Sequence, residues 1–218
     1  MTDSQTMTRR TRAEIAAETR EAILAAACEV IADIGFENVR MRIVAERAGV
    51  STAALHYHFD TREKLFAEAL RYSFEHTGRD VYEARSSQDS ATNRLARIIS
   101  ASLPTTELLR REWAMYQELW CRANREPESR AVAVELNRAQ QGWIEETLAD
   151  GVAAGEFAAV DTAAHARLIS SLCDGFGLQL MFGNPTLTVD SARTTIWTQA
   201  ARVLGISEQF PEDGRDEN

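Results

Sequence analysis

The chain has 218 residues, of which 44% are hydrophobic and 26% are charged, and its formal net charge is −9. This balance is typical of a globular protein, and the absence of any run of about 18 apolar residues predicts no transmembrane helix. The N-terminal stretch MTDSQTMTRRTR has no apolar core and predicts no signal peptide. Three widely spaced cysteines (Cys28, Cys121 and Cys173) fit neither a zinc site nor a disulfide framework, and indicate free thiols in a reducing cytoplasm.

The predicted fold is all-α with about nine helices, because apolar residues recur at steps of three and four and no stretch alternates with the period of a strand. Gly35 ends the first helix, Gly49 ends the second, Ser51 is a good N-cap for the third, and Asp60 with Glu63 resembles a capping box for the fourth. The predicted helices span 13–34, 40–48, a stretch from Thr52, a stretch after Asp60, 91–103, 105–124, 128–154, 161–182 and 189–204.

The polar connector ARSSQDSA at 84–91 predicts a boundary between a first domain of residues 11–80 and a larger domain of residues 81–206. Residues 207–218 are predicted to form a disordered acidic tail. Residues 1–80 hold 11 basic and 13 acidic side chains, whereas residues 81–218 hold 13 and 20. Because docking depends on the local field, the net acidity does not exclude a nucleic-acid partner.

Residues 45–59, AERAGVSTAALHYHF, place two short helices around a turn that contains a glycine. This pattern predicts a helix-turn-helix, in which the second helix enters the major groove of DNA. That helix has no acidic residue to repel the phosphates, and the small Ala53 and Ala54 allow a close approach of its backbone. Its hydroxyl, imidazole and phenol groups can contact base edges or phosphates.

The segment from Arg12 to Leu70 resembles the DNA-binding domain of the tetracycline-repressor (TetR) family, through ILAAACEVIADIGFENV, IVAERAGVSTAALHYHF and TREKLF. The resemblance implies a homodimeric, all-helical transcription regulator, most often a repressor that a small ligand releases from double-stranded operator DNA. Since a single recognition helix reads few base pairs, a palindromic operator with two half-sites is expected.

Three positions differ from the residue that the family usually has. Arg40 stands where the family usually has a capping Thr, so Asn38 or a neighbour is expected to cap the second helix. His56 stands where the family usually has Tyr, so the operator preference need not follow relatives. Arg62 stands where the family usually has a phosphate-binding Lys, and the run Arg9, Arg10 and Arg12 either reaches DNA or forms a solvated tail. The residues predicted to contact DNA are Arg42, Ser51, Thr52, Ala53, Ala54, His56, Tyr57, His58, Arg62 and Lys64.

The larger half contains an aromatic stripe in ELLRREWAMYQELWCRA that is compatible with a plain core and with the lining of a ligand pocket. The stretch AAHARLISSLCDGFGLQLMFGN resembles the penultimate helix of the choline-responsive betaine-regulator (BetI-like) branch, which implies a ligand core and a dimer interface built as a four-helix bundle. The predicted ligand residues are Trp113, Tyr116, Trp120, Trp143, Asp174 and Phe176, with Glu118 or Asp174 balancing a cationic ligand. The predicted dimer contacts are Leu168, Leu172, Phe176, Ile196, Ala200 and Val203.

The sequence holds no GxSxG, CxxC, HExxH or P-loop motif, so neither an enzyme nor a cofactor or metal site is predicted. The function predicted is a DNA-binding transcriptional regulator gated by an apolar or cationic small organic molecule. The alternative is a DNA-binding regulator whose C-terminal domain binds a protein partner and no small ligand.

Overall fold

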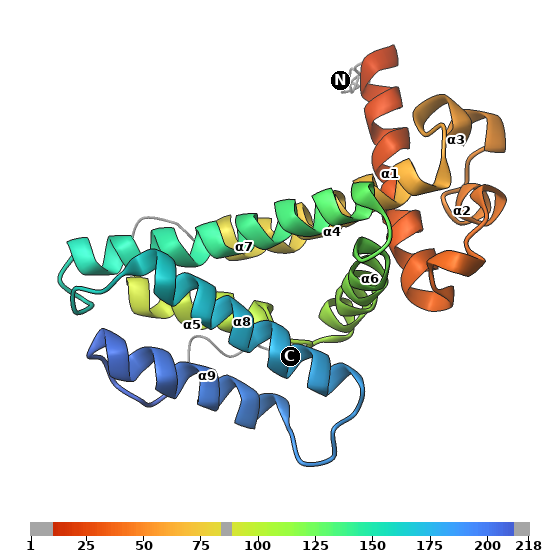
Figure 1. Cartoon of the computed structure of the whole chain (residues 1–218). Helices are drawn as coiled ribbons and strands as arrows, with labels where there is room; N and C mark the ends of the chain where they lie inside the picture. Colours follow the sequence, from red (N-terminus) through yellow and green to blue (C-terminus); the bar gives the residue numbers. More distant parts are fainter. Residues whose placement is uncertain (1–10, 84–88, 212–218) are drawn as a thin grey trace, which may run out of the picture. The chain divides into compact units, whose positions relative to one another are not determined.

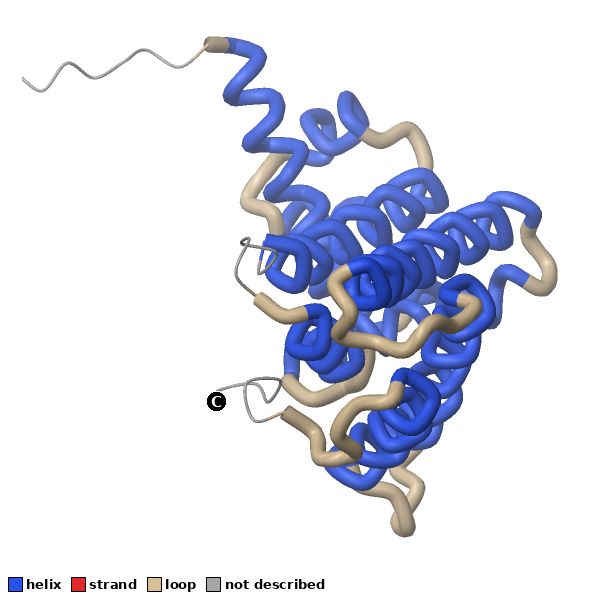
Figure 2. Tube along the Cα trace, turned by 90° about the vertical axis from the view of Figure 1, so that its left-hand side faces the viewer, coloured by secondary structure: helices blue, strands red, loops and turns tan. Residues whose placement is uncertain are grey.

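The computed structural model describes residues 11–83 and 89–211, and within these ranges it is all-α, without strands (Figures 1 and 2). This confirms the predicted fold class, and no predicted helix bound differs from the observed one by more than two residues. Arg9, Arg10 and most of the predicted acidic tail lie outside the described residues. The elements are α1 (Arg12–Ile34), the 3-10 helix η1 (Phe36–Asn38), α2 (Met41–Arg47), α3 (Thr52–His58), α4 (Arg62–Glu83), α5 (Ala91–Ala101), α6 (Glu107–Ala123), α7 (Pro127–Ala153), α8 (Thr162–Met181) and α9 (Val189–Leu204).

The chain divides into two compact units, Met1–Tyr72 and Ser73–Asn218, and the division falls inside α4. The functional boundary expected near residue 80 stays a prediction. None of the helices in the described parts of the chain is long and apolar enough to cross a membrane.

The first unit packs the middle of α1 against η1, α2, α3 and the beginning of α4. Its fully buried side chains include Ile23, Phe36, Leu55 and Leu65. The apolar stripe predicted along α1 is longer than the face that is buried, because Ile15 near its start is 50% exposed and Ile34 at its end is 39% exposed. Only the central turns of α1 therefore belong to this core.

Helix ends in the first unit are set by local hydrogen bonds, and two of them differ from the prediction. Ser51 caps α3 as expected, since its Oγ accepts a hydrogen bond from the backbone N–H of Ala54 at 3.0 Å. Helix α2 has no side-chain cap, because the Asn38 amide donates to the carbonyl of Ile34 instead.

The prediction that Asp60 caps α4 is also wrong. The Thr61 hydroxyl accepts from the N–H of Lys64 at 3.1 Å, and the Thr61 carbonyl accepts from the N–H of Leu65. Asp60 lies one residue too early for this geometry, and its carboxylate lies 3.4 Å from Lys64 Nζ. Two adjacent residues of similar capping ability thus leave the start of the helix uncertain by one position from the sequence.

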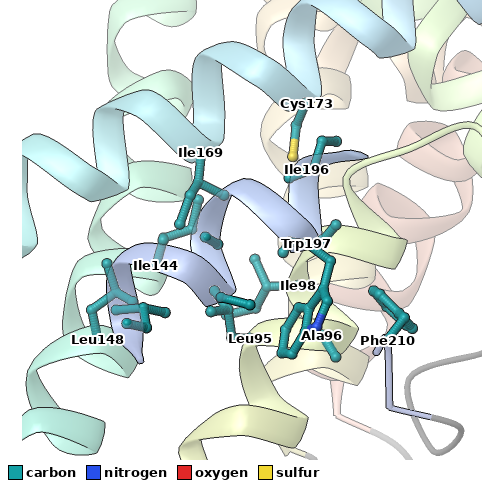
Figure 3. Close-up of a cluster of buried hydrophobic side chains, with 14 of the residues drawn as sticks. Leu95, Ala96, Ile98, Ile144, Leu148, Ile169, Cys173, Ile196, Trp197 and Phe210 are labelled. Carbon is teal, nitrogen blue, oxygen red and sulfur yellow. The ribbon is translucent and has the colours of Figure 1, made fainter. Parts of the chain in front are cut away.

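The second unit has a large hydrophobic core contributed by α5, α7, α8 and α9 (Figure 3). Leu95, Ile144, Cys173 and Ile196 are fully buried in it. The ring of Trp197 is also buried, and its indole N–H donates to the carbonyl of Ser207 at 3.0 Å, so its polar atom is satisfied. Burial raises the pKa of the Cys173 thiol to about 12, which keeps this thiol neutral.

Candidate functional site

Helix α3 presents a polar surface on the side opposite its one fully buried residue, Leu55. The exposed residues are Ser51, Thr52, Ala53, His56 and Tyr57, whereas Ala54 and His58 are half-buried. Tyr57 is the most prominent of them, with 82% of its surface exposed. Since neither acid nor bulky apolar side chain occupies this surface, it can approach a polyanion closely.

Two of the basic side chains predicted to contact phosphate lie at the surface in weak ion pairs. Arg42 is 72% exposed and pairs with Glu46 on the next turn of α2, and Lys64 is 55% exposed beside Asp60. Exposed pairs of this kind contribute about 0–1 kcal/mol. Either cation can therefore leave its carboxylate for a phosphate at little cost.

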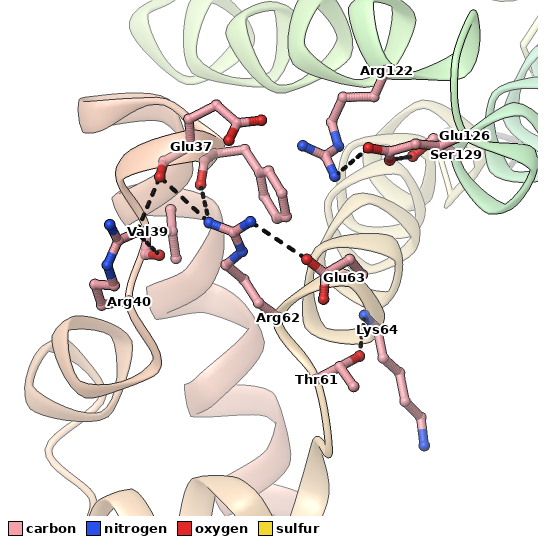
Figure 4. A network of polar contacts seen from close by, with 11 residues as sticks. Glu37, Val39, Arg40, Thr61, Arg62, Glu63, Lys64, Arg122, Glu126 and Ser129 are labelled. Atoms are coloured by element: carbon pink, nitrogen blue, oxygen red, sulfur yellow. Dashed lines mark hydrogen bonds and ion pairs between the residues drawn. The ribbon is translucent and has the colours of Figure 1, made fainter.

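Arg62 has an internal role that the sequence did not indicate (Figure 4). Its guanidinium lies 4.3 Å from the centre of the Phe36 ring, a cation–π contact, and Nη1 lies 3.4 Å from the carbonyl oxygens of Phe36 and Glu37. These contacts join the start of α4 to η1. The phosphate contact expected of Arg62 stays a prediction.

A cavity of about 90 Å³ lies inside the second unit. A single water needs about 10–15 Å³ on a comparable measure, so the cavity has room for a small organic molecule. Five of the six predicted ligand residues line it. The lining residues are Phe74, Ile98, Ala101, Ser102, Leu109, Glu112, Trp113, Tyr116, Leu119, Trp120, Ala133, Leu136, Asn137, Gln140, Trp143 and Asp174.

The aromatic side chains of the pocket form two groups. On α6, Trp113 and Trp120 meet edge to face with their ring centres 5.6 Å apart, and Tyr116 lies along Trp120 at 6.3 Å. Across α4 and α7, the rings of Phe74 and Trp143 stack 4.5 Å apart. Such aromatic faces attract both apolar groups and organic cations.

Two carboxylates line the same pocket in different environments. Glu112 is 7% exposed and accepts a hydrogen bond from the Ser73 hydroxyl at 2.7 Å. Burial raises the pKa of Asp174 to about 6, and no residue in the described parts of the chain donates a hydrogen bond to its carboxylate. Asp174 is half-buried, and partial loss of water around a carboxylate without a donor costs free energy unless a cation accompanies it.

Of the two alternative counter-charges predicted, Asp174 lines the pocket and Glu118 does not, whereas Glu112 lines it without having been predicted. A signal for Glu112 was present, because Leu109, Glu112, Tyr116 and Leu119 recur at steps of three and four on α6. An acid inside an apolar stripe of this kind indicates either a buried hydrogen bond or a ligand contact.

A polar layer of side chains connects three helices at the pocket. The Gln140 side chain donates to Ser102 Oγ at 3.2 Å and accepts from Ser170 Oγ at 3.1 Å. Ser170 is fully buried, so this bond satisfies a hydroxyl that would otherwise be costly. Gln140 thus joins α7 to the C-terminal end of α5 and to the middle of α8.

Several predicted positions are placed elsewhere by the structure. Phe176 does not line the pocket and packs, with Leu172, against the hydrophobic core of the second unit. Ile196 and Ala200 are buried within that core, at 0% and 6% exposure, so they are unavailable to a second subunit and the prediction that they form the dimer interface is wrong.

Other apolar side chains of α8 and the following turn, and of α9, remain at the surface. Leu168 is 50% and Val203 is 42% exposed, as a subunit contact requires. Leu178 and Phe182, which were not predicted, are 40% and 66% exposed. Leu168, Leu178 and Phe182 fall on one side of α8 and its continuation, since a helix repeats every 3.6 residues or so.

Comparison with known proteins agrees with this architecture. A family model described as BetI-type transcriptional repressor, C-terminal, matches residues 91–205, and one described as bacterial regulatory proteins, tetR family, matches residues 23–69. The chain belongs to the TetR family of helix-turn-helix transcriptional regulators. Its C-terminal region is of the BetI type.

Individual TetR-family relatives are similar at moderate identity. The regulator BetI of Agrobacterium fabrum is 28% identical over 119 residues, covering 55% of this chain and 58% of BetI, so the match spans a little over half of that relative. A transcriptional regulator from Saccharomonospora viridis, solved in complex with choline, is 30% identical with a TM-score of 0.73, covering 83% of this chain and 94% of that one. A TetR-family regulator from Rhodococcus sp. is 26% identical with a TM-score of 0.77, covering 86% and 99%.

Proposed function

We propose that this chain is a cytoplasmic, homodimeric repressor that binds a palindromic operator through α3 and leaves it when a small organic cation enters the pocket. In this proposal residues 11–80 bind DNA, and residues 81–206 bind the ligand and form the dimer. The observation that carries the ligand assignment is Asp174, a half-buried carboxylate that lines a pocket with aromatic walls and has no hydrogen-bond donor among the described residues.

The DNA part of the proposal is supported by the surface of α3. Thr52, His56 and Tyr57 supply donors and acceptors for base edges, and Arg42 and Lys64 supply mobile positive charge for phosphates. Two such helices related by a twofold axis would meet half-sites about 34 Å apart. The dimer is assigned to the exposed apolar surface of Leu168, Leu178, Phe182 and Val203, because exposed apolar side chains gathered on neighbouring elements mark interaction sites.

The ligand part follows from the chemistry of the pocket. A cation over an indole face gains about 0.5–2 kcal/mol, and the Asp174 carboxylate adds a charge that it can pair with. The similar regulator from Saccharomonospora viridis holds choline, which supports a quaternary ammonium as the first candidate. Release from DNA requires that the ligand bind the DNA-free conformation more tightly than the DNA-bound one.

The test is an electrophoretic shift of the DNA upstream of the chain's own gene, with and without choline. We expect a specific complex that choline dissociates and that dimethylbutanol, the uncharged carbon analogue of choline, leaves intact. The Trp120→Ala variant should bind the operator and fail to respond to choline. A complex that responds only to neutral hydrophobes would exclude the cation, and a complex that responds to no small molecule would favour a protein partner for the second unit.

A further inference from the structure

Gly177 occupies a buried position of α8 that only glycine can fill. A Cβ at this position would lie 2.1 Å from Cζ2 and 2.2 Å from Cη2 of Trp113, far inside any van der Waals contact. Both atoms belong to the six-membered ring of the indole, so this ring lies directly against the α8 backbone. Glycine inside a helix is destabilising relative to alanine, and its presence at a buried position calls for a packing reason.

The close approach brings Trp113 to the turn of α8 that carries Asp174. Asp174 precedes Gly177 by three residues, and side chains three apart lie on the same face of a helix. Trp113 and Asp174 both line the pocket. Trp113 also contacts Trp120 edge to face. The positions of both α6 tryptophan rings in the pocket therefore depend on how closely Trp113 packs against α8.

We propose that Gly177 creates a subsite for the head group of a small organic cation, in which Trp113 supplies the aromatic face and Asp174 the negative charge. This inference rests on the proposed function and names the part of the pocket that selects the ligand. A quaternary or protonated amine gains from the ring and from the carboxylate, whereas a neutral molecule of the same shape gains from the ring alone. Gly177 is a positioning residue, because it acts by setting where the indole lies relative to the Asp174 turn.

The chain offers two matched controls on α7. A Cβ on Gly151 would lie 2.2 Å from Cδ2 of Phe157, an overlap as severe as that at Gly177, but Phe157 belongs to the hydrophobic core and does not line the pocket. A Cβ on Gly142 would meet no atom within 4 Å. Gly151→Ala therefore introduces a steric overlap like that of Gly177→Ala, but away from the residues of the subsite. Gly142→Ala makes the same glycine-to-alanine change in a helix without any steric overlap.

The experiment measures the Kd of choline by calorimetry and the melting temperature of the full-length wild type and the three variants. We expect Gly177→Ala to raise the Kd at least about tenfold, the upper range of a single cation–π contact. Gly151→Ala should lower the melting temperature by a similar amount to Gly177→Ala and keep the Kd within about twofold of wild type, since its damage is remote from the pocket. Gly142→Ala should change neither quantity.

Asp174→Asn keeps the shape of the site and tests the charge without any steric overlap, should Gly177→Ala fold poorly. It should lose choline affinity and lose the preference for choline over dimethylbutanol. An unchanged choline Kd in Gly177→Ala, or in Asp174→Asn, would overturn the subsite while the proposed function stands. A wild type that binds no organic cation would overturn both.

Discussion

Replacing Asp174 by Asn should stabilise the ligand-free protein at neutral pH. Burial raises the pKa of this carboxyl from 3.8 to about 6, so the ionised form is disfavoured in the folded protein. Each pKa unit corresponds to about 1.4 kcal/mol, which makes the cost of the ionised carboxylate on the order of 3 kcal/mol above pH 6. The amide has the same shape and no charge, and it removes this cost.

The stability difference between Asp174→Asn and the wild type should increase as the pH rises. Below pH 3.8 the carboxyl is protonated in the folded and the unfolded chain, so the wild type and Asp174→Asn should be equally stable. As the pH rises the unfolded chain loses its proton first, and the wild type loses stability relative to the variant until the pH passes about 6. The difference should be on the order of 3 kcal/mol at pH 7.5 and about 1 kcal/mol at pH 4.5.

The measurement is urea unfolding of both proteins at the two pH values, at one fixed protein concentration because assembly shifts apparent stability. Glu145→Gln, at an exposed carboxylate of α7, is the control and should change the free energy of unfolding by less than about 0.5 kcal/mol. If Asp174→Asn is no more stable than wild type at pH 7.5, or if its advantage does not shrink at pH 4.5, the reasoning from burial is refuted.

Four further outcomes are expected. Choline affinity should be constant above pH 7 and fall about tenfold per pH unit below pH 6, because the cation needs the ionised form of Asp174; a Kd independent of pH between 5 and 8 in calorimetry contradicts this. Arg62→Ala should lower the melting temperature, because it removes the contacts that join α4 to η1. Lys64→Ala should leave the melting temperature unchanged and reduce the salt slope of DNA binding by about one, and an unchanged slope in a fluorescence-anisotropy salt series counts against a phosphate contact. Phe182→Arg should give a folded monomer that binds the operator weakly, whereas a dimer in sedimentation at micromolar concentration would move the interface elsewhere.

The positions of the helices were predictable because their causes are local. Apolar periodicity, the Ser51 cap and the turn glycines all act within a few residues of the helix that they define. The cap predicted for α4 was wrong because Asp60 and Thr61 are both good caps, and one hydrogen bond decides between them. The aromatic stripe of α6 also identified the pocket, since Trp113, Tyr116 and Trp120 share a face whatever packs against it.

Contacts between distant residues were not predictable in the same way. The periodicity of α9 marks Ile196 and Ala200 as one apolar face, but it does not say whether that face packs inside the subunit or against another one. The hydrogen bond between Ser73 and Glu112 and the ring contact between Arg62 and Phe36 join residues far apart in the sequence. The sequence around one residue of each pair gives no indication of which distant residue it will contact.

Asp174 and Gly177 are two residues of α8 that lower the stability expected from sequence rules for helices and protein interiors. A half-buried carboxylate without a donor and a glycine inside a helix each disfavour folding, and both occur within one turn of α8. Natural sequences tolerate such conflicts mainly at functional sites, where another requirement outweighs the loss of stability. In the proposed function, a bound cation would supply that requirement at both positions, because it would need the charge of Asp174 and the Trp113 ring that Gly177 admits.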